Sequence, residues 1–268
     1  MVDVAVIAKP ELFEIPIPDV SNLVTEDDTP VESIFSERQM HLLTDALYTS
    51  WTPPVEARSF VAMANVAIYA MTSQPPLVPD VLVSLDVQLP EDLFEKGHRC
   101  YFIWLYGKPP DVVIEIVSNR VGGELSDKLR GYERLRVPYY IVYDPDQHLG
   151  EKTLCIYELR GGNYAARTEP WLPSVGLGVT IWSGDYRGFK GDFLRWCDID
   201  GALYPTGVEA ALAAQRQADS EREQALLAWQ QVDTERAYAE QERQRAEQER
   251  QRAEQLAARL RALGVEVD

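Results

Sequence analysis

The chain has 268 residues with 46% hydrophobic content, which predicts one substantial hydrophobic core. A formal net charge of -17 argues against a protein that holds nucleic acid on a broad basic surface, because Lys and Arg side chains supply most of the affinity for phosphates. The cysteines lie far apart and no apolar stretch is long enough to span a bilayer, so we expect a cytoplasmic protein without a disulfide framework or membrane segment.

Residues 1–35 are predicted to form an acidic leader. They contain four prolines and show neither helical nor strand periodicity. Much of the negative charge lies here, and a detached acidic arm says little about a cleft elsewhere in the chain. Residues 36–39, Ser-Glu-Arg-Gln, have the pattern of a capping box, and Met40 and Leu43 follow with helical spacing. This pattern predicts that the first helix begins at Ser36.

Residues 36–205 contain segments with strand periodicity and segments with helical periodicity, which predicts an α/β domain. Its main predicted elements are three strands, a helix and a fourth strand, at residues 59–70, 80–87, 111–117, 124–136 and 139–143. Apolar residues fill nearly every position of the third strand, as expected for a strand covered on both faces. The last strand, helix and strand predict a right-handed parallel crossover. Residues 153–159 are predicted to extend the sheet, whereas residues 182–203 give no assignment.

The C-terminal segment, residues 206–268, differs in composition from the rest of the chain. Ala, Gln, Glu and Arg dominate it, and the seven residues at 239–245 recur unchanged at 246–252, which predicts a long helix. An apolar stripe with a seven-residue repeat runs from Ala211 to Leu260 and has the phase of a coiled coil. Three residues later, however, the partner positions include Glu221, Glu235, Glu242 and Glu249, with apolar Leu256 and Leu263 only near the end. Two interpretations therefore stay open: a weak coiled coil, or a solvated helix held by ion pairs such as Glu242 with Arg245.

Glu115 is the first candidate for chemistry in the α/β domain. Alternation along the third strand places it on one face of a strand that is otherwise almost entirely apolar. A buried carboxylate needs a cation or a proton, because its desolvation costs on the order of several kcal/mol. A divalent metal ion and a neighbouring Lys or Arg side chain are the two alternatives for that cation.

Asp80 and Lys128 are the other two candidates. Asp80 follows Pro79 at the start of the second strand, where such a residue marks either a turn or a ligand. Lys128 lies within the apolar stripe of the second helix, between Leu125 and Tyr132, so its side chain is predicted to reach toward the sheet. The alternative for Lys128 is a side chain that extends along the helix edge into solvent.

Asp80, Glu115 and Lys128 together indicate a chemistry that none of them indicates alone. Mg²⁺ takes oxygen ligands, usually one or two carboxylates with water and substrate phosphate. Such an ion lowers the pKa of a bound water molecule, and a nearby lysine stabilises the attacking hydroxide. These residue types therefore predict hydrolysis of a phosphodiester bond.

Five short segments carry a resemblance to a known family. They lie at positions 78–81, 110–118, 128–132, 137–140 and 144–145, and read VPDV, PDVVIEIVS, KLRGY, VPYY and DP. Through them, residues 36–200 resemble the putative restriction endonuclease family of bacterial proteins, within the PD-(D/E)XK nuclease superfamily. The resemblance implies a restriction-endonuclease-like fold, in which helices flank a mixed central sheet with the core order αβββαβ. It also implies a Mg²⁺-dependent endonuclease acting on DNA, with Mn²⁺ as a substitute ion.

The resemblance also implies roles for single residues. Asp80 matches the metal-binding aspartate of the second core strand, and Glu115 the acidic residue of the third. The superfamily lysine normally follows two residues after the glutamate, where this chain has Val117, and Lys128 on the next helix is the residue that matches in this family. Asp111 is implied as an accessory residue.

The backbone carbonyl of Ile116 is implied as a further metal ligand. A homodimer with the C-terminal helix as a contact is a further expectation, because related nucleases commonly pair to cut two strands. The alternative function is a catalytically inactive nuclease fold that acts as an assembly module through its C-terminal helix. The acidic composition and the valine at position 117 favour this alternative.

Overall fold

The structure is a computed structural model of the chain, and it describes residues 17–25, 33–54, 58–119 and 123–262. The chain divides into two compact units, Met1–Gly207 and Val208–Asp268. The first unit contains the sheets, and the second contains most of one long helix.

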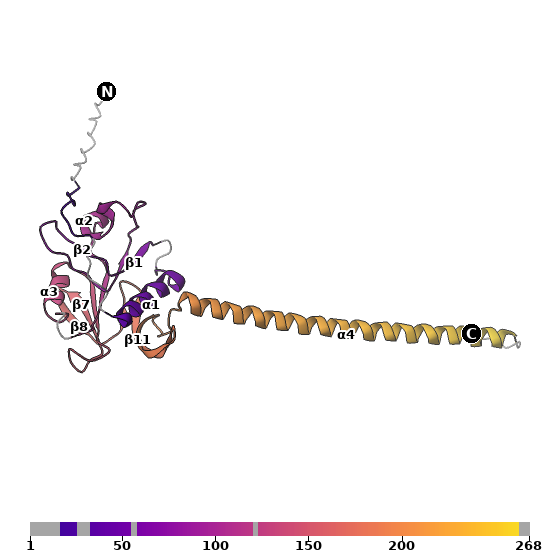
Figure 1. Cartoon of the computed structure of the whole chain (residues 1–268). Helices are drawn as coiled ribbons and strands as arrows, with labels where there is room; N and C mark the ends of the chain where they lie inside the picture. The colour runs from indigo at the N-terminus through magenta and orange to yellow at the C-terminus, as the bar shows by residue number, and fades with distance from the viewer. Residues whose placement is uncertain (1–16, 26–32, 55–57, 120–122, 263–268) are drawn as a thin grey trace, which may run out of the picture. The chain divides into compact units, whose positions relative to one another are not determined.

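A six-stranded mixed sheet forms the centre of the first unit (Figure 1). Its strands, in spatial order, are β1 (Phe60–Ala64), β3 (Val81–Leu85), β5 (Val112–Ile116), β6 (Tyr139–Tyr143), β7 (Leu154–Arg160) and β8 (Asn163–Arg167). Strands β5 and β6 are parallel, and the other neighbouring pairs are antiparallel. Helix α3 (Asp127–Arg134) connects the parallel pair, as a parallel crossover requires. The predicted α/β class with a mixed central sheet is confirmed.

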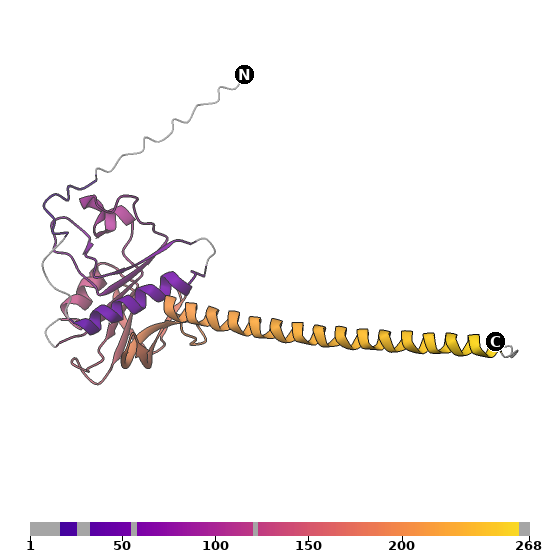
Figure 2. The ribbon, with the colours of Figure 1, turned by 45° about the vertical axis from the view of Figure 1, so that its right-hand side comes forward.

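Helices cover both faces of this sheet, and Figure 2 shows α1 (Ile34–Ser50) crossing in front of the strands. On that face Leu43 of α1 joins Ile114 of β5 in the larger hydrophobic cluster. On the opposite face Tyr132 of α3 joins Val113 of β5 in a second cluster. Alternate residues of a strand point to opposite faces, so the apolar run of β5 supplies both clusters.

Helix α1 begins earlier than the capping pattern predicts. Ser33 is its N-cap, and the Oγ of Ser33 accepts a hydrogen bond from the backbone N–H of Ser36 at 3.0 Å. Ser36 itself lies buried in the first turn. The prediction that the helix begins at Ser36 is wrong, because Ser33 offers the same capping chemistry three residues earlier.

The strand predicted at residues 59–70 is two strands in different sheets. Strand β1 ends at Ala64, and Asn65 follows with a left-handed φ of 53°, which interrupts the ladder. Strand β2 (Ile68–Tyr69) then pairs in parallel with β4 (Tyr101–Phe102). The remaining short elements of this region are η1 (Lys96–His98) and α2 (Ile103–Tyr106). Apolar residues on both sides of the break hide it from sequence periodicity.

Most of residues 182–203, which the sequence leaves unassigned, belong to a three-stranded antiparallel sheet. Its strands are β9 (Trp171–Leu172), β10 (Leu177–Tyr186) and β11 (Phe189–Cys197). Gln39 of α1 is fully buried against β11, where its Nε2 donates to the carbonyl of Leu194 at 2.8 Å and its Oε1 accepts from the Leu194 N–H at 3.0 Å. A side chain of α1 thus satisfies backbone groups at the edge of β11.

Part of the predicted leader packs against the α/β domain. Val20 packs on a small cluster that contains Tyr69, and the hydroxyl of Tyr69 donates a hydrogen bond to the carbonyl of Val24 at 2.6 Å. This part of the leader is therefore in contact with the domain. Residues 1–16 and 26–32 lie outside the described part of the chain.

Helix α4 (Gly207–Ala262) forms the described part of the second unit. It contains 56 residues and is about 84 Å long at 1.5 Å per residue, so the predicted long C-terminal helix is confirmed. Ion pairs within the helix join Arg245 to Glu242 at 3.9 Å and Arg250 to Glu254 at 3.1 Å. Among the described residues, no helix combines the length and the apolar content needed to cross a bilayer.

Candidate active site

Asp80 and Glu115 lie on neighbouring strands at one end of the central sheet. In the antiparallel pair β3–β5, Val81 lies opposite Ile114. Continuing this register by one residue sets Asp80 opposite Glu115, on the face that α3 covers. Residues directly opposite in such a pair have Cβ atoms about 5 Å apart. Strand pairing therefore brings together two carboxylates that are distant in the sequence.

Glu115 is almost fully buried, with 2% of its surface exposed, and both of its carboxylate oxygens accept hydrogen bonds. Oε1 accepts from the hydroxyl of Tyr132 at 2.6 Å, and Oε2 accepts from the ammonium group of Lys128 at 2.8 Å. Both donors come from α3, where positions 128 and 132 are about one turn apart and share the face turned toward the sheet. The helix thus provides the partners that the buried carboxyl group needs.

The carboxylate of Asp80 is tied to the backbone of β5. Its Oδ2 accepts a hydrogen bond from the backbone N–H of Ile116 at 2.6 Å. The resemblance implies the backbone carbonyl of Ile116 as a metal ligand. The contact seen here involves the N–H of the same residue. The charge of Asp80 raises the pKa of both Glu115 and Lys128, although neither pKa is shifted mainly by it. The structure thus brings Asp80, Glu115 and Lys128 into one group.

Burial is the largest influence on the pKa of Glu115 and of Lys128. It raises the pKa of Glu115 from the usual 4.5 to about 8; the charge of Asp80 acts in the same direction, and Lys128 and Tyr132 oppose it. Burial lowers the pKa of Lys128, but the nearby carboxylates outweigh it, so that this pKa is raised overall. Lys128 is therefore a permanent cation, whereas Glu115 exchanges a proton near neutral pH.

Glu124 joins the group from the turn before α3, and sequence reasoning missed it. Its side chain is 7% exposed, and its Oε1 lies 3.4 Å from the Nζ of Lys128. Its Oε2 is buried and has no hydrogen-bond partner in the described part of the chain. The spacing of four residues between Glu124 and Lys128 was the signal available in the sequence. Asp80, Glu115, Glu124, Lys128 and Tyr132 together form the Glu115 cluster.

Asp111 lies toward the other end of β5. Its Oδ2 accepts hydrogen bonds from the ammonium group of Lys108 at 2.5 Å and from the backbone N–H of Leu85 at 2.8 Å. Four residues of extended chain separate Asp111 from Glu115, which corresponds to about 13 Å. The structure therefore does not bring Asp111 into the Glu115 cluster.

The donor set of the Glu115 cluster fits a hard divalent cation. Two of its carboxylates, Glu115 and Glu124, share the single ammonium group of Lys128, and Asp80 adds a third negative charge. Within the described residues, no three His, Cys, Asp or Glu side chains converge closely enough to ligate one ion by themselves. Mg²⁺ does not require such a set, because it usually binds one or two carboxylates and keeps several water molecules.

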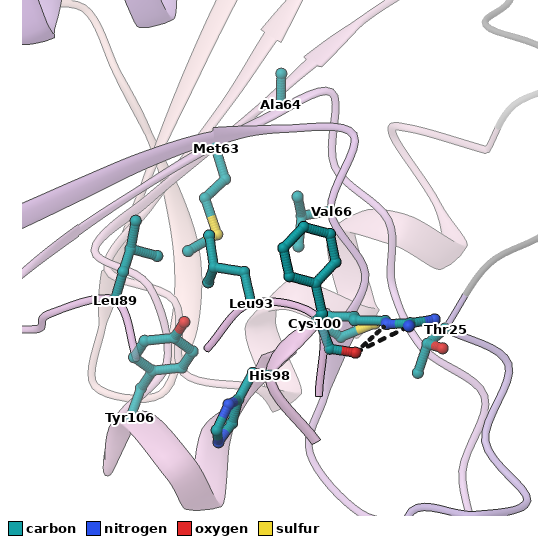
Figure 3. A pocket seen from close by; sticks show the side chains of 11 residues that line it. Thr25, Met63, Ala64, Val66, Leu89, Leu93, His98, Cys100 and Tyr106 are labelled. Atoms are coloured by element: carbon teal, nitrogen blue, oxygen red, sulfur yellow. Dashed lines mark hydrogen bonds between the residues drawn. The ribbon is translucent and has the colours of Figure 1, made fainter. Parts of the chain in front are cut away.

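A cavity of about 540 Å³ opens beside the same end of the sheet (Figure 3). Met63 and Ala64 of β1 and Tyr106 of α2 line it, and Figure 3 shows these side chains around the opening. The backbone N–H of Asn65, the next residue, donates to the carbonyl of Asp80 at 2.9 Å. No member of the Glu115 cluster lines this cavity, so it is a neighbour of the cluster rather than part of it.

The fold and the position of the two strand-borne carboxylates define the class of protein. A mixed sheet in the order β1-β3-β5-β6, with a helix on each face and acidic residues at adjoining ends of β3 and β5, is a restriction-endonuclease-like fold. Residues 26–178, more than half of the 268 residues, match the model of the putative restriction endonuclease family. The chain therefore belongs to this family, as its resemblance implied. No curated protein and no solved structure matches the chain.

Proposed function

We propose that the protein is a Mg²⁺-dependent endonuclease that hydrolyses phosphodiester bonds of DNA, with Mn²⁺ as a substitute ion. The observation that carries this proposal is the 2.8 Å contact between Lys128 Nζ and Glu115 Oε2, beside Asp80 on the neighbouring strand. Metal-assisted hydrolysis of a phosphodiester needs carboxylates for the ion and a cation near the attacking water. Membership of a nuclease family supports the same class of reaction.

Each residue of the proposed site has its own role. Asp80 and Glu115 would hold the metal through their carboxylate oxygens, and the carbonyl of Ile116 would be a further ligand. When bound, Mg²⁺ lowers the pKa of a water molecule and neutralises charge on the phosphate. Lys128 stabilises the attacking hydroxide and the negative charge that develops on the phosphate oxygens.

The bond changes of the proposed reaction need no covalent intermediate with the protein. The oxygen of the water forms the new bond to phosphorus, and the bond from phosphorus to the leaving oxygen breaks. The proton of the water passes to solvent, and the leaving oxygen takes up a proton from solvent. The residues of the chain act by binding, orienting and stabilising charge.

We assign this activity to a domain of residues 36–205, with the acidic leader before it and the helical segment 206–268 after it. The Glu115 cluster and most residues of the four hydrophobic clusters belong to this domain. Helix α1 begins at Ile34 and the family match at residue 26, so both extend slightly into the leader.

Nicking of supercoiled plasmid in Mg²⁺ and in Mn²⁺ tests the proposal. We expect the unaltered protein to nick the plasmid, and we expect Asp80→Asn and Glu115→Gln each to lower the rate by about a hundredfold or more, because each removes a charge that holds the ion. Lys128→Ala is expected to lower the rate by about ten- to a hundredfold, through loss of charge stabilisation.

Asp127→Asn is the matched control for these variants. Asp127 is an exposed residue in the first turn of α3, next to Lys128, and is not in the Glu115 cluster. Its substitution removes one negative charge close to the site and is expected to leave the nicking rate within about twofold. Nicking that persists unchanged in all three site variants contradicts the assignment of the site.

The second candidate function is that of an inactive nuclease fold that assembles two copies through α4. Exposed apolar side chains in the middle of α4 favour it, at Leu226, Leu227 and Trp229, which are 58%, 59% and 67% exposed. The valine at position 117, where the superfamily has its lysine, favours it as well. This candidate predicts that the intact protein binds no Mg²⁺ in a calorimetric titration. The endonuclease predicts binding that Glu115→Gln abolishes.

A further inference from the structure

The Glu115 cluster contains one more carboxylate than the proposed endonuclease site uses. Glu124 lies in the turn before α3, with only 7% of its side chain exposed. The hydroxyl of Tyr140 donates to the backbone carbonyl of Glu124 at 2.8 Å, which fixes this turn against β6. The backbone that carries the Glu124 side chain is therefore held against the central sheet.

The hydrogen bonds of the cluster leave one buried oxygen without a donor. Both oxygens of Glu115 accept hydrogen bonds, at 2.6 and 2.8 Å. The Oε1 of Glu124 has a longer contact of 3.4 Å with Lys128, and its Oε2 has no partner among the described residues. Leaving a buried acceptor unpaired costs about 1–3 kcal/mol, and more for a charged group. A buried polar atom without a partner needs an explanation, and a bound ion is one that fits a carboxylate.

The charges of the cluster indicate that the ligand is a cation. The ammonium of Lys128 lies between Glu115 and Glu124 and is the single positive charge that these two carboxylates share in the described contacts. Asp80 lies opposite Glu115 and adds a third negative charge. Ionised, the three carboxylates exceed the ammonium by two negative charges, which is the charge of one divalent ion.

We infer that Glu124 is a third acidic ligand of the divalent-cation site, which it binds through Oε2, either directly or through one metal-bound water molecule. The inference rests on the proposed function, because Asp80 and Glu115 provide the other ligands. Mg²⁺ keeps several of its waters in protein sites, so a carboxylate slightly too far for direct ligation still binds the ion through them. Outer ligands of this kind typically change metal affinity by about 10- to 100-fold.

Calorimetric titration of the full-length protein with Mn²⁺, without DNA, tests this inference. Glu124→Gln keeps the size of the side chain and leaves an amide oxygen that accepts a hydrogen bond from Lys128, while it removes the charge. We expect this variant to bind Mn²⁺ at least about tenfold more weakly than the unaltered protein. Asp127→Asn, which removes an exposed charge three residues away, is the control and is expected to bind within about twofold.

The outcomes separate the inference from the proposed function. If Glu115→Gln loses Mn²⁺ binding and Glu124→Gln binds as tightly as the unaltered protein, the role of Glu124 is overturned and the endonuclease site stands. If the unaltered protein binds no Mn²⁺, both fail. Should Glu124→Gln not fold, Glu124→Asp replaces it. This variant keeps the charge but draws the carboxylate back by one methylene group, and an unchanged affinity overturns the inference.

Discussion

At the scale of single residues, Glu115 couples the candidate site to the stability of the fold. Burial raises the pKa of its carboxyl group to about 8, from the usual 4.5 of an exposed glutamate. Between these two values the folded protein holds a proton that the unfolded chain has already released, so raising the pH favours unfolding. The contribution of Glu115 is therefore complete below the unfolded pKa and is lost as the pH rises through the folded one.

We expect the metal-free protein to lose on the order of a few kcal/mol of unfolding free energy between about pH 5 and pH 8 through this residue. The measurement is urea unfolding in the presence of a chelator, for the unaltered protein and for Glu115→Gln. The glutamine variant does not titrate here, and the difference between the two proteins isolates the contribution of Glu115. If the unfolding free energies of the two proteins differ by the same amount at every pH in this range, the prediction is contradicted.

At the scale of secondary-structure elements, Gln39 joins α1 to the edge of β11. Its side-chain amide makes two hydrogen bonds to the backbone of Leu194, and the residue is fully buried. The free edge of a strand exposes backbone donors and acceptors, and this side chain satisfies one of each. Helix α1 also covers the face of the central sheet opposite the Glu115 cluster, so this contact joins the smaller sheet to the helix that packs on that face.

We expect Gln39→Ala to lower the free energy of unfolding by about 2–4 kcal/mol, because it leaves a buried N–H and a buried carbonyl without partners. Chemical denaturation monitored by circular dichroism provides the measurement. Glu37→Ala changes an exposed residue of the same helix and is expected to cost less than about 1 kcal/mol. Equal losses in the two variants disprove the role of Gln39.

At the scale of the whole molecule, the chain joins a folded domain to a long helix with exposed apolar residues. The four hydrophobic clusters are built entirely from residues that precede Gly207. Within α4, the side chains of Leu226, Leu227 and Trp229 are each more than half exposed. Helices in proteins gain most of their stability by packing an apolar face, so we expect a second copy of this helix to cover these side chains.

We expect a chain that ends at Gly207 to keep the melting temperature of the domain within about 2 °C, because no residue of its core is removed. Light scattering is expected to show a dimer for the full chain and a monomer for the shortened one. A melting temperature lowered by more than about 5 °C shows that the domain depends on α4. A dimer that survives the deletion places the contact between copies outside α4.

The sequence predicts those features that depend on near neighbours in the chain. The apolar run around Glu115 marks a strand covered on both faces, and the structure has β5 in that place. Helical spacing places Lys128 on the face of its helix that meets the sheet, where the structure also has it. The composition of residues 206–268 is enough to predict a long helix, because propensity summed over many residues outweighs local exceptions.

Only the tertiary structure decides which distant groups meet. The pairing of β3 with β5 sets Asp80 opposite Glu115. Asp111 lies at the other end of β5, where it binds Lys108 instead. The unpaired oxygen of Glu124 becomes evident only when every neighbouring donor has a position in space. The pattern of residues in the sequence determines on which face of a strand or helix a side chain lies, because that depends on periodicity. Which residue the side chain then contacts depends on strand register and on helix packing, and these bring together residues far apart in the chain.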